Sequence, residues 1–295
     1  MSALATFPFR SNNGFISGQG RINASLTNNG HVNLSNGTLR FGSQVTNDGH
    51  VNVTNGTLNF SAQVTNNASG FISGEGTSAI RFEDGLDNSG SLILTFSTST
   101  VFGNIVNNPT GLVSLAGNST ASFIGDVSNN GQLYVGSGSH AVFGGHTSGS
   151  GSFPGSGTVE FVDGFSPGSS PAEVSFGGDV VLGPSSATLM ELAGTESGEY
   201  DRLLVAGVLD LAGGLEIELL DDFIPTLDDA FQIFEVTELL GTFSSVLLPE
   251  LSGNLSWDHS HLYSSGTLSV IPEPASALLT GISLIGLLGL RRQRK

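Results

Sequence analysis

Hydrophobic and polar positions alternate along most of this chain in short runs, and the runs are separated by Asn, Gly and Ser. One unit consists of a short alternating run, a turn and a second short run, as in residues 31–34 and 38–41. A period of two is typical of β-strands, and so small a unit has no room for a helix. The pattern therefore predicts an all-β protein that is built from short strands.

The same unit recurs along the first half of the chain. The stretch LTNNGHVNLSNGTLRFGSQ from Leu26 aligns almost letter for letter with VTNDGHVNVTNGTLNFSAQ from Val45, 19 residues later. Weaker copies follow at nearly regular intervals, and they begin at Val64, Leu86, Val106 and Val127. A unit of this size cannot bury its own apolar side chains, so it must stack on its neighbours.

Two columns of residues persist through the units even where the rest of the sequence changes. The first is an Asn two positions after each start, at Asn28, Asn47, Asn66, Asn88, Asn108 and Asn129. The second is a Phe further along the unit, at Phe41, Phe60, Phe82, Phe102, Phe123, Phe143 and Phe161. Columns that survive while their surroundings drift indicate positions that meet from one unit to the next.

We interpret the units as coils of a right-handed parallel β-helix with about 19–22 residues per coil. Strands on successive coils then lie about 4.8 Å apart. The Phe column becomes an interior aromatic stack, and the Asn column becomes a ladder of side-chain amides at a bend of the main chain. A β-sandwich whose spacing is coincidental is the alternative.

The body resembles the passenger-type β-solenoids of bacterial surface proteins, including autotransporter-like and haemagglutinin-like chains. The resemblance is carried by these short degenerate repeats, so it implies an architecture and says little about an activity.

The composition divides the chain into three parts. Residues 1–164 carry the regular repeats, and the Asn column stops there. Residues 165–271 hold 17 of the 26 acidic residues and still show strand patterns, so we expect more irregular coils that close the solenoid. A separate β-sandwich domain is the alternative for this region. Residues 272–295 form a tail of different character.

Charge and cysteine content narrow the range of functions. Four of the nine basic residues lie in the last five positions, so the rest of the chain has 26 acidic against 5 basic residues. A body with a charge near −21 repels phosphate backbones, and we expect no nucleic-acid partner. The absence of cysteine excludes disulfides and thiolate metal sites.

Candidate metal sites are weak, and we expect neither a metal nor a cofactor. His31 and His50 share a repeat position and would stack on adjacent coils, but no column of carboxylates accompanies them. His259 and His261 would share one face of a strand. The acidic pairs 221–222 and 228–229 offer loop oxygens for calcium. Solvated surface positions are the preferred interpretation of all three.

The alternative functional class is a β-helix polysaccharide lyase or hydrolase. Lyases of this shape resemble one another in using Arg or Lys as the base, and Lys295 is the only lysine of this chain. Arg40 and Arg81 precede a Phe and should point outward. A hydrolase needs two facing carboxylates. The best acidic cluster is Glu83, Asp84 and Asp87. We expect no catalytic residues and no enzymatic activity.

The tail has three parts. Pro272, Glu273 and Pro274 come first, and the prolines leave an extended, accessible peptide there. Residues 275–290 are uncharged and slightly shorter than the roughly 20 residues that span a bilayer comfortably. A basic end follows, and such charge stays on the cytoplasmic side of a membrane. Its residues are Arg291, Arg292, Arg294 and Lys295.

This order of PEP, apolar run and basic end is similar to the PEP-CTERM sorting signal. The resemblance implies an exosortase-type membrane protease that recognises the tail and removes it. The protein would pass through the inner membrane with its body in the periplasm. It would then reach the cell surface or the extracellular polysaccharide matrix of a Gram-negative bacterium. An ordinary membrane helix is the alternative.

Together these features predict a structural or adhesive protein that is associated with exopolysaccharide or biofilm. Such a protein needs an N-terminal signal peptide, and residues 1–18 show neither a charged start nor an apolar core. We expect that the true start lies upstream of Met1. A polysaccharide lyase or hydrolase with the same tail is the alternative function.

Overall fold

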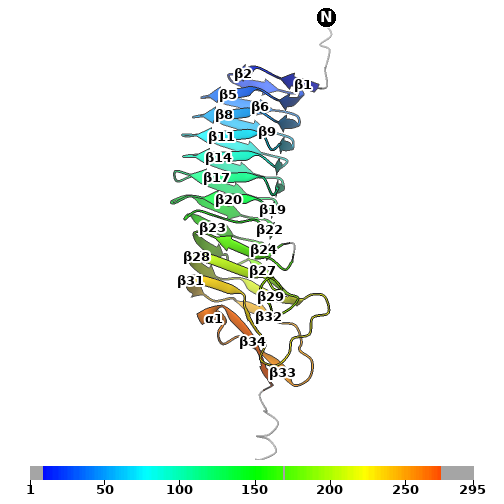
Figure 1. The fold of residues 1–295 in the computed structure, drawn as a ribbon. Coiled ribbons are helices and arrows are strands. Elements are labelled where there is room, and N and C mark those ends of the chain that lie inside the picture. The colour runs from blue at the N-terminus through cyan, green and yellow to red at the C-terminus, as the bar shows by residue number, and fades with distance from the viewer. Residues whose placement is uncertain (1–8, 169, 274–295) are drawn as a thin grey trace, which may run out of the picture.

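The structure is a computed structural model that describes residues 9–168 and 170–273. The chain forms an elongated, all-β parallel solenoid of about 9 turns, with almost no helix. The turns stack one below another from the N-terminal strands to the C-terminal ones (Figure 1). This confirms the predicted parallel β-solenoid, and the stacking explains how units without a core of their own can fold.

Three parallel sheets run along the solenoid. Sheet A has twelve strands: β1 (Phe9–Asn12), β4 (Ser25–Asn28), β7 (Val45–Asn47), β10 (Val64–Asn66), β13 (Leu86–Asn88), β16 (Ile105–Asn107), β19 (Val127–Asn129), β22 (His146–Gly149), β24 (Gly164–Pro167), β27 (Ala187–Leu192), β29 (Gly214–Leu219) and β32 (Ser245–Leu247). Sheet B has seven: β2 (Phe15–Ser17), β5 (His31–Ser35), β8 (His50–Thr54), β11 (Phe71–Glu75), β14 (Ser91–Thr95), β17 (Leu112–Ala116) and β20 (Gln132–Val135).

Sheet C also has twelve strands: β3 (Gly20–Ile22), β6 (Thr38–Phe41), β9 (Thr57–Phe60), β12 (Ala79–Phe82), β15 (Thr98–Val101), β18 (Thr120–Phe123), β21 (His140–Phe143), β23 (Thr158–Phe161), β26 (Asp179–Leu182), β25 (Glu173–Phe176), β28 (Arg202–Leu211) and β31 (Phe234–Gly241). Inward and outward side chains alternate along the strands, as the period of two requires.

A buried ladder of asparagines runs along the inner side of sheet A. Each amide nitrogen before the last donates to the side-chain oxygen of the next Asn at 2.7–2.9 Å and to a main-chain carbonyl at 3.1–3.4 Å. The ladder therefore satisfies its own polar groups inside the core. Its members are Asn12, Asn28, Asn47, Asn66, Asn88, Asn107 and Asn129.

Glycines make room for this ladder where the chain passes from sheet A to sheet B. A Cβ at Gly49 would clash with the carbonyl oxygen of Gly30, and a Cβ at Gly90 would clash with that of Gly70. Both contacts would be closer than real Cβ atoms come to backbone atoms. Successive coils can approach here only because these positions have no side chain.

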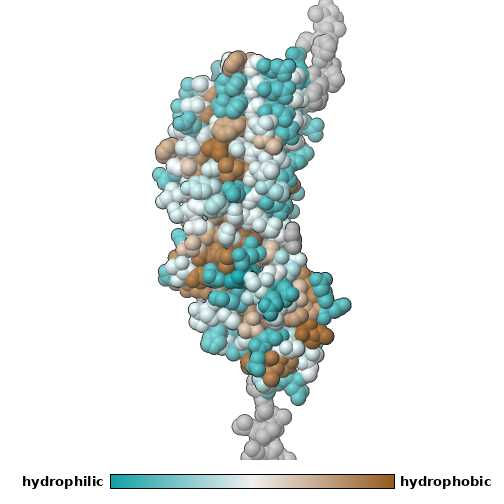
Figure 2. Space-filling model, viewed as in Figure 1, coloured by the Kyte–Doolittle hydropathy of each residue, from teal (hydrophilic) through white to brown (hydrophobic). Residues whose placement is uncertain are grey.

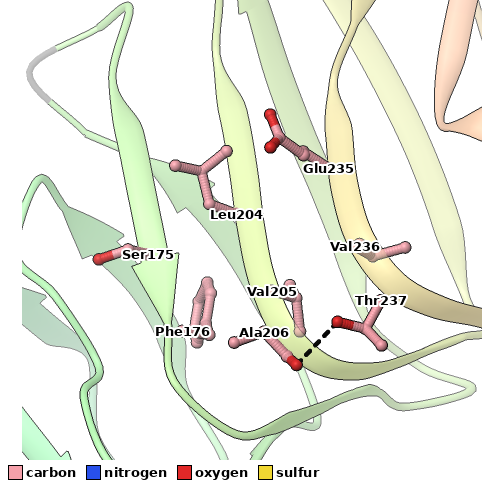
Figure 3. Close-up of a pocket in the computed structure, with 8 residues that line it drawn as sticks. All are labelled: Ser175, Phe176, Leu204, Val205, Ala206, Glu235, Val236 and Thr237. Atoms are coloured by element: carbon pink, nitrogen blue, oxygen red, sulfur yellow. Dashed lines mark hydrogen bonds between the residues drawn. The ribbon is translucent and has the colours of Figure 1, made fainter.

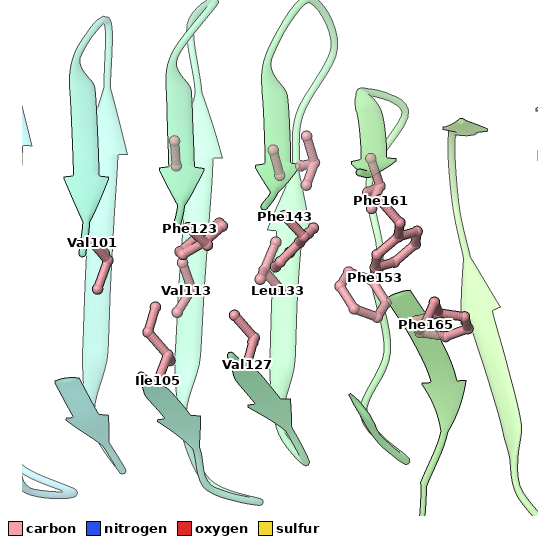
Figure 4. Close-up of a cluster of buried hydrophobic side chains, with 14 of the residues drawn as sticks. Val101, Ile105, Val113, Phe123, Val127, Leu133, Phe143, Phe153, Phe161 and Phe165 are labelled. Carbon is pink, nitrogen blue, oxygen red and sulfur yellow. The ribbon is translucent and has the colours of Figure 1, made fainter. Parts of the chain in front are cut away.

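A stack of apolar side chains fills the inner side of sheet C. Phe41 and Phe60 stack with ring centroids 5.2 Å apart, and Phe123 and Phe143 stack at 4.8 Å. Figure 4 shows Val101, Phe123, Phe143 and Phe161 following one another on successive coils. These side chains are almost completely buried, so they form a continuous core along the solenoid.

The structure corrects two expected positions, and both lie on the same coil. Asn107, not Asn108, joins the ladder. Val101, not Phe102, lies between Phe82 and Phe123 in the interior stack. Phe102 is 40% exposed, and the side chain of Asn108 instead donates to Asp87 at 2.6 Å. A slip of one residue moves a strand side chain to the opposite face of its sheet.

The parallel sheets continue past residue 164. β24, β27, β29 and β32 extend sheet A in register, so residues after 164 keep adding coils. β28 pairs first with β25 and then with β26. The C-terminal end carries an antiparallel sheet D, which consists of β30 (Ala230–Gln232), β34 (Thr267–Pro272) and β33 (Leu255–Asp258), and helix α1 (Leu262–Ser265).

Most of the expected tail falls outside the described residues. Pro272 ends β34 and Glu273 follows it, both exposed. Pro274, residues 275–290 and the basic end at Arg291, Arg292, Arg294 and Lys295 lie beyond the described part. Within residues 9–168 and 170–273, no helix has the length and hydrophobicity that crossing a bilayer requires.

The interior stack predicts a contrast between two phenylalanines. Phe60→Ala should lower the free energy of unfolding by about 3–5 kcal/mol, because it leaves a cavity between Phe41 and Phe82. Phe102→Ala should cost less than about 1 kcal/mol, since its ring lies on the surface. Urea unfolding of both variants measures the contrast, and equal losses would contradict the assignment.

The ladder predicts a second contrast between neighbouring residues. Asn107→Ala removes the acceptor of Asn88 and the donor to Asn129, so unfolding should become easier by about 2–4 kcal/mol. Asn108→Ala serves as the control and should change stability by less than about 1 kcal/mol. A larger loss for the Asn108 variant in the same urea titration would show that the ladder register is wrong.

Candidate functional site

Three of the five arginines outside the tail lie in one outward-facing column on sheet C. Arg21 lies opposite Arg40 in the register of β3 and β6, and Arg40 lies opposite Asn59. Asn59 in turn lies opposite Arg81 on β12. We refer to Arg21, Arg40, Asn59 and Arg81 as the arginine row. It follows the solenoid axis over the first four coils.

The neighbouring coil supports each guanidinium of the arginine row in a similar way. The Nη2 atom of Arg21 would lie 3.2 Å from a Cβ at Gly42, so its guanidinium covers this glycine. The Nε atom of Arg40 donates to the hydroxyl of Ser61 at 2.8 Å. The Cζ atom of Arg81 lies 5.3 Å from the ring centroid of Phe102, a cation–π contact. All three side chains lean toward the same end of the solenoid.

The arginine row has no carboxylate partners among the described residues. Neither Arg21, Arg40 nor Arg81 forms an ion pair within 4.0 Å there, whereas Arg202 forms two. Glu83 is the acidic residue nearest to the row in the strand register. It follows β12 directly, at the position that Ser61 holds on the coil before and Phe102 on the coil after. The buried Oδ1 atom of Asn59 also lacks a hydrogen-bond donor. The row therefore has guanidinium groups with unused hydrogen-bonding capacity.

A row of four aromatic rings follows the outer face of sheet B. Phe15 and His31 stack with centroids 5.0 Å apart, and His31 and His50 stack at the same distance. Phe71 continues the row at 5.6 Å from His50, with a tilted ring. Phe15 is 76% exposed at one end of this row. The two histidines stack as the sequence predicted, but they do so between two phenylalanines.

Polar side chains accompany these rings on the same face of sheet B. Asn52 donates to Asn33 at 3.0 Å and accepts from the hydroxyl of Ser73 at 2.9 Å. This outer ladder is half-buried. Its groups are largely paired with one another, so the face offers fewer free donors than the arginine row.

A shallow pocket of about 390 Å³ lies further along the solenoid, where β28 passes from β25 to β26. Leu204 and Val236 line it together with Ser175 and Glu235, and Thr237 donates to the carbonyl of Ala206 at 2.9 Å (Figure 3). Hydrophobic side chains gather over this middle part of the molecule, near β28 (Figure 2). Pockets of this volume suit small ligands, but few polar groups converge here.

Ion pairs fix the charged groups beside this pocket. Arg202 donates to Glu173 at 2.8 Å and to Glu235 at 2.6 Å. The three side chains lie on adjacent strands of sheet C. Because both carboxylates share one guanidinium, this cluster mainly joins β25, β28 and β31.

Asp201 is a fully buried carboxyl group on the chain just before β28. It accepts the main-chain N–H groups of Ala172 at 2.6 Å and of Glu191 at 2.9 Å, so it connects two distant segments. Burial raises the pKa of Asp201 from 3.8 to about 7, against the effect of these two hydrogen bonds. This position is structural, since it lies away from the surface.

The other candidate residues are not assembled into a site. Glu83 and Asp84 are exposed at a turn, whereas Asp87 bonds Asn108. The expectation that His259 and His261 share a strand face is wrong, because β33 ends at Asp258. The acidic pairs 221–222 and 228–229 lie in the loop before β30. Across the described ranges, no three His, Asp or Glu side chains meet closely enough to hold a metal ion.

Two groups of residues were missed by the sequence interpretation. Arg21 belongs to the column of Arg40, and the 19-residue offset between them was a usable signal. Phe15 and Phe71 belong to the column of His31 and His50. The sequence intervals from Phe15 to His31 and from His50 to Phe71 both differ from the interval between the two histidines. Those irregular offsets, together with the change of residue type, concealed the aromatic row.

Comparison with known proteins gives no family for this chain. No protein-family model matches the sequence, and no curated protein is significantly similar to it.

The pKa of Asp201 predicts a pH-dependent contribution to stability. Its folded pKa is raised, so the folded state binds the extra proton between pH 4 and 7. The contribution is complete below about pH 4 and is lost as the pH rises through about 7. Asp201→Asn cannot titrate, so its stability relative to the parent should rise with pH, by on the order of 2–4 kcal/mol.

Urea midpoints at pH 4.5 and 7.5 test this expectation, with Asp210→Asn as the exposed control. If the urea midpoints of the parent and the Asp201 variant change equally between these two pH values, the buried carboxyl group does not titrate in this range.

Proposed function

We propose that this protein is an exported, non-enzymatic β-solenoid with a structural or adhesive role at a bacterial surface or in an extracellular matrix. Its tail acts as a PEP-CTERM-type sorting signal that an exosortase-type protease reads. In this role the protein is associated with exopolysaccharide or biofilm material. The proposal combines the repeat architecture of the body with the three-part order of the tail.

The position of Pro272 and Glu273 is the observation that carries the proposal. β34 is the last strand of the described residues, and both side chains are exposed at its end. The only hydrogen bond of Glu273 within this part of the chain joins its main-chain N–H to the carbonyl of Asn254 at 2.8 Å. A protease can therefore contact these two side chains at the surface, and Pro272 itself is paired with Leu255 in sheet D.

The distribution of side chains between the interior and the surface of the body agrees with a structural role. The interior is filled by the Asn ladder and the apolar stack, and the outward positions carry mostly short polar side chains. The alternative role as a lyase or hydrolase requires a constellation of facing catalytic groups. Among the described residues, Glu83, Asp84 and Asp87 do not converge in this way.

The tail can be tested by replacing Pro272, Glu273 and Pro274 with alanine. The body of this variant should fold normally, because the first two side chains are exposed. In a host with an exosortase, and with a working signal peptide fused upstream, the parent should lose its tail and leave the membrane. The alanine variant should remain full-length and membrane-bound, with residues 275–290 as a membrane-spanning helix.

The control is a double variant, Ser264→Ala with Ser265→Ala, which changes exposed residues at the same end of the molecule. It should be processed like the parent, as shown by fractionation and the mass of the product. If the alanine variant of the PEP motif is trimmed and released to the same extent, the tail is not a sorting signal of this type.

A further inference from the structure

The arginine row is an unusual feature in a body as acidic as this one. The protein has 26 acidic residues and a formal charge of −17, yet three arginines gather in one column without carboxylate partners among the described residues. Arg202 pairs with two carboxylates, whereas the arginines of the row pair with none among the described residues. The row therefore indicates a site for an anion that comes from outside the chain.

The register makes the row unfavourable unless an anion is present. Arg21 and Arg40 lie directly opposite each other on neighbouring strands. Like charges in this position are destabilising in a sheet. An anionic group between the two guanidinium groups would remove the repulsion and accept their N–H groups. Planar guanidinium groups bind carboxylates and sulfates with two parallel hydrogen bonds.

The geometry of the row suits an extended ligand. Neighbouring strands are about 4.8 Å apart, so Arg21 and Arg40 are separated by one such step and Arg40 and Arg81 by two. These intervals are comparable with the length of one or two sugars in an extended polysaccharide. Thr38 and Thr57 lie two positions earlier on the same face of their strands and add hydroxyl groups beside the row.

We propose that the arginine row binds an acidic polysaccharide, which lies along the solenoid axis across β3, β6, β9 and β12. Arg21, Arg40 and Arg81 bind its anionic groups, and Thr38 and Thr57 bind its hydroxyls. The ring of Phe102 holds the guanidinium of Arg81 in place. The proposal rests on the proposed matrix function and names the class of glycan that the surface would bind.

A nucleic acid is a poorer ligand for the row. The acidic body repels its phosphates over a long range. In addition, a single column of three arginines contacts too few phosphates to offset this repulsion. Duplex DNA carries one charge per about 1.7 Å of its axis, whereas a polysaccharide with one charge per sugar meets less of this repulsion and still matches the spacing of Arg21 and Arg40.

The test measures binding of the full chain, purified in mild detergent, to polygalacturonate and to its fully methyl-esterified form. Both probes share a backbone, but only the first carries carboxylates. We expect binding of the acidic form alone, and an affinity that falls with added salt. Arg40→Gln should weaken it at least about 10-fold. Arg10→Gln is the control for charge, since Arg10 lies on β1 of sheet A, and should stay within about 2-fold.

A gain of binding provides a check that misfolding cannot imitate. Glu83→Gln removes the carboxylate beside the row and should tighten binding of polygalacturonate by about 2-fold or more. Equal binding of both forms of the polymer, equal effects of the Arg10 and Arg40 variants, or tighter binding of duplex DNA would each overturn the proposal. Release of reducing ends from the polymer would instead overturn the non-enzymatic function. Processing of the tail does not depend on these arginines, so the two proposals can fail separately.

Discussion

Every coil of this protein depends on the coil before it and the coil after it, because one turn of about 20 residues cannot enclose a core. The constraint is the register of parallel strands. Once two coils are hydrogen-bonded in register, equivalent residues lie one above another at the strand spacing. The Asn ladder and the apolar stack both follow from this single condition, since each consists of like residues that meet across neighbouring coils.

The two interior columns contribute to the fold in different ways. The apolar stack supplies burial, and it tolerates Val101 in a column of phenylalanines because its interaction is not directional. The Asn ladder is directional, and each amide uses both of its hydrogens. Replacing one Asn would leave buried groups of two other residues without partners. The ladder therefore fixes the register, whereas the stack provides most of the hydrophobic free energy.

Because the interior is filled in this way, the outward positions are free to serve other purposes. The same register that aligns the core also aligns surface residues, and it brings together arginines from the first, second and fourth coils. A column of like residues is stabilising for amides and rings, but it is unfavourable for cations. The arginine row on sheet C is thus hard to explain by the stability of the fold alone.

The sequence by itself determined the class of fold, the length of a coil and most members of both interior columns. The repeat length and the period of two are local properties, and stacking on neighbouring units buries the apolar side chains that one unit cannot enclose. The sequence did not decide which residues of the coil around residues 98–108 point inward. Val101 and Ile105 are four positions apart, and so are Phe102 and Val106, so the sequence allowed either pair to point inward. Pairing with β12 and β18 decided between them.

Only the tertiary structure could show which surface residues meet. The alignment of Phe15, His31, His50 and Phe71 depends on turns of different length, and these are set by packing of each coil on its neighbour. The lack of ion pairs between the arginine row and carboxylates, within the part of the chain that the structure describes, is likewise a property of three-dimensional distances. The sequence encodes which residues repeat, and the hydrogen-bonded register decides which of them face one another.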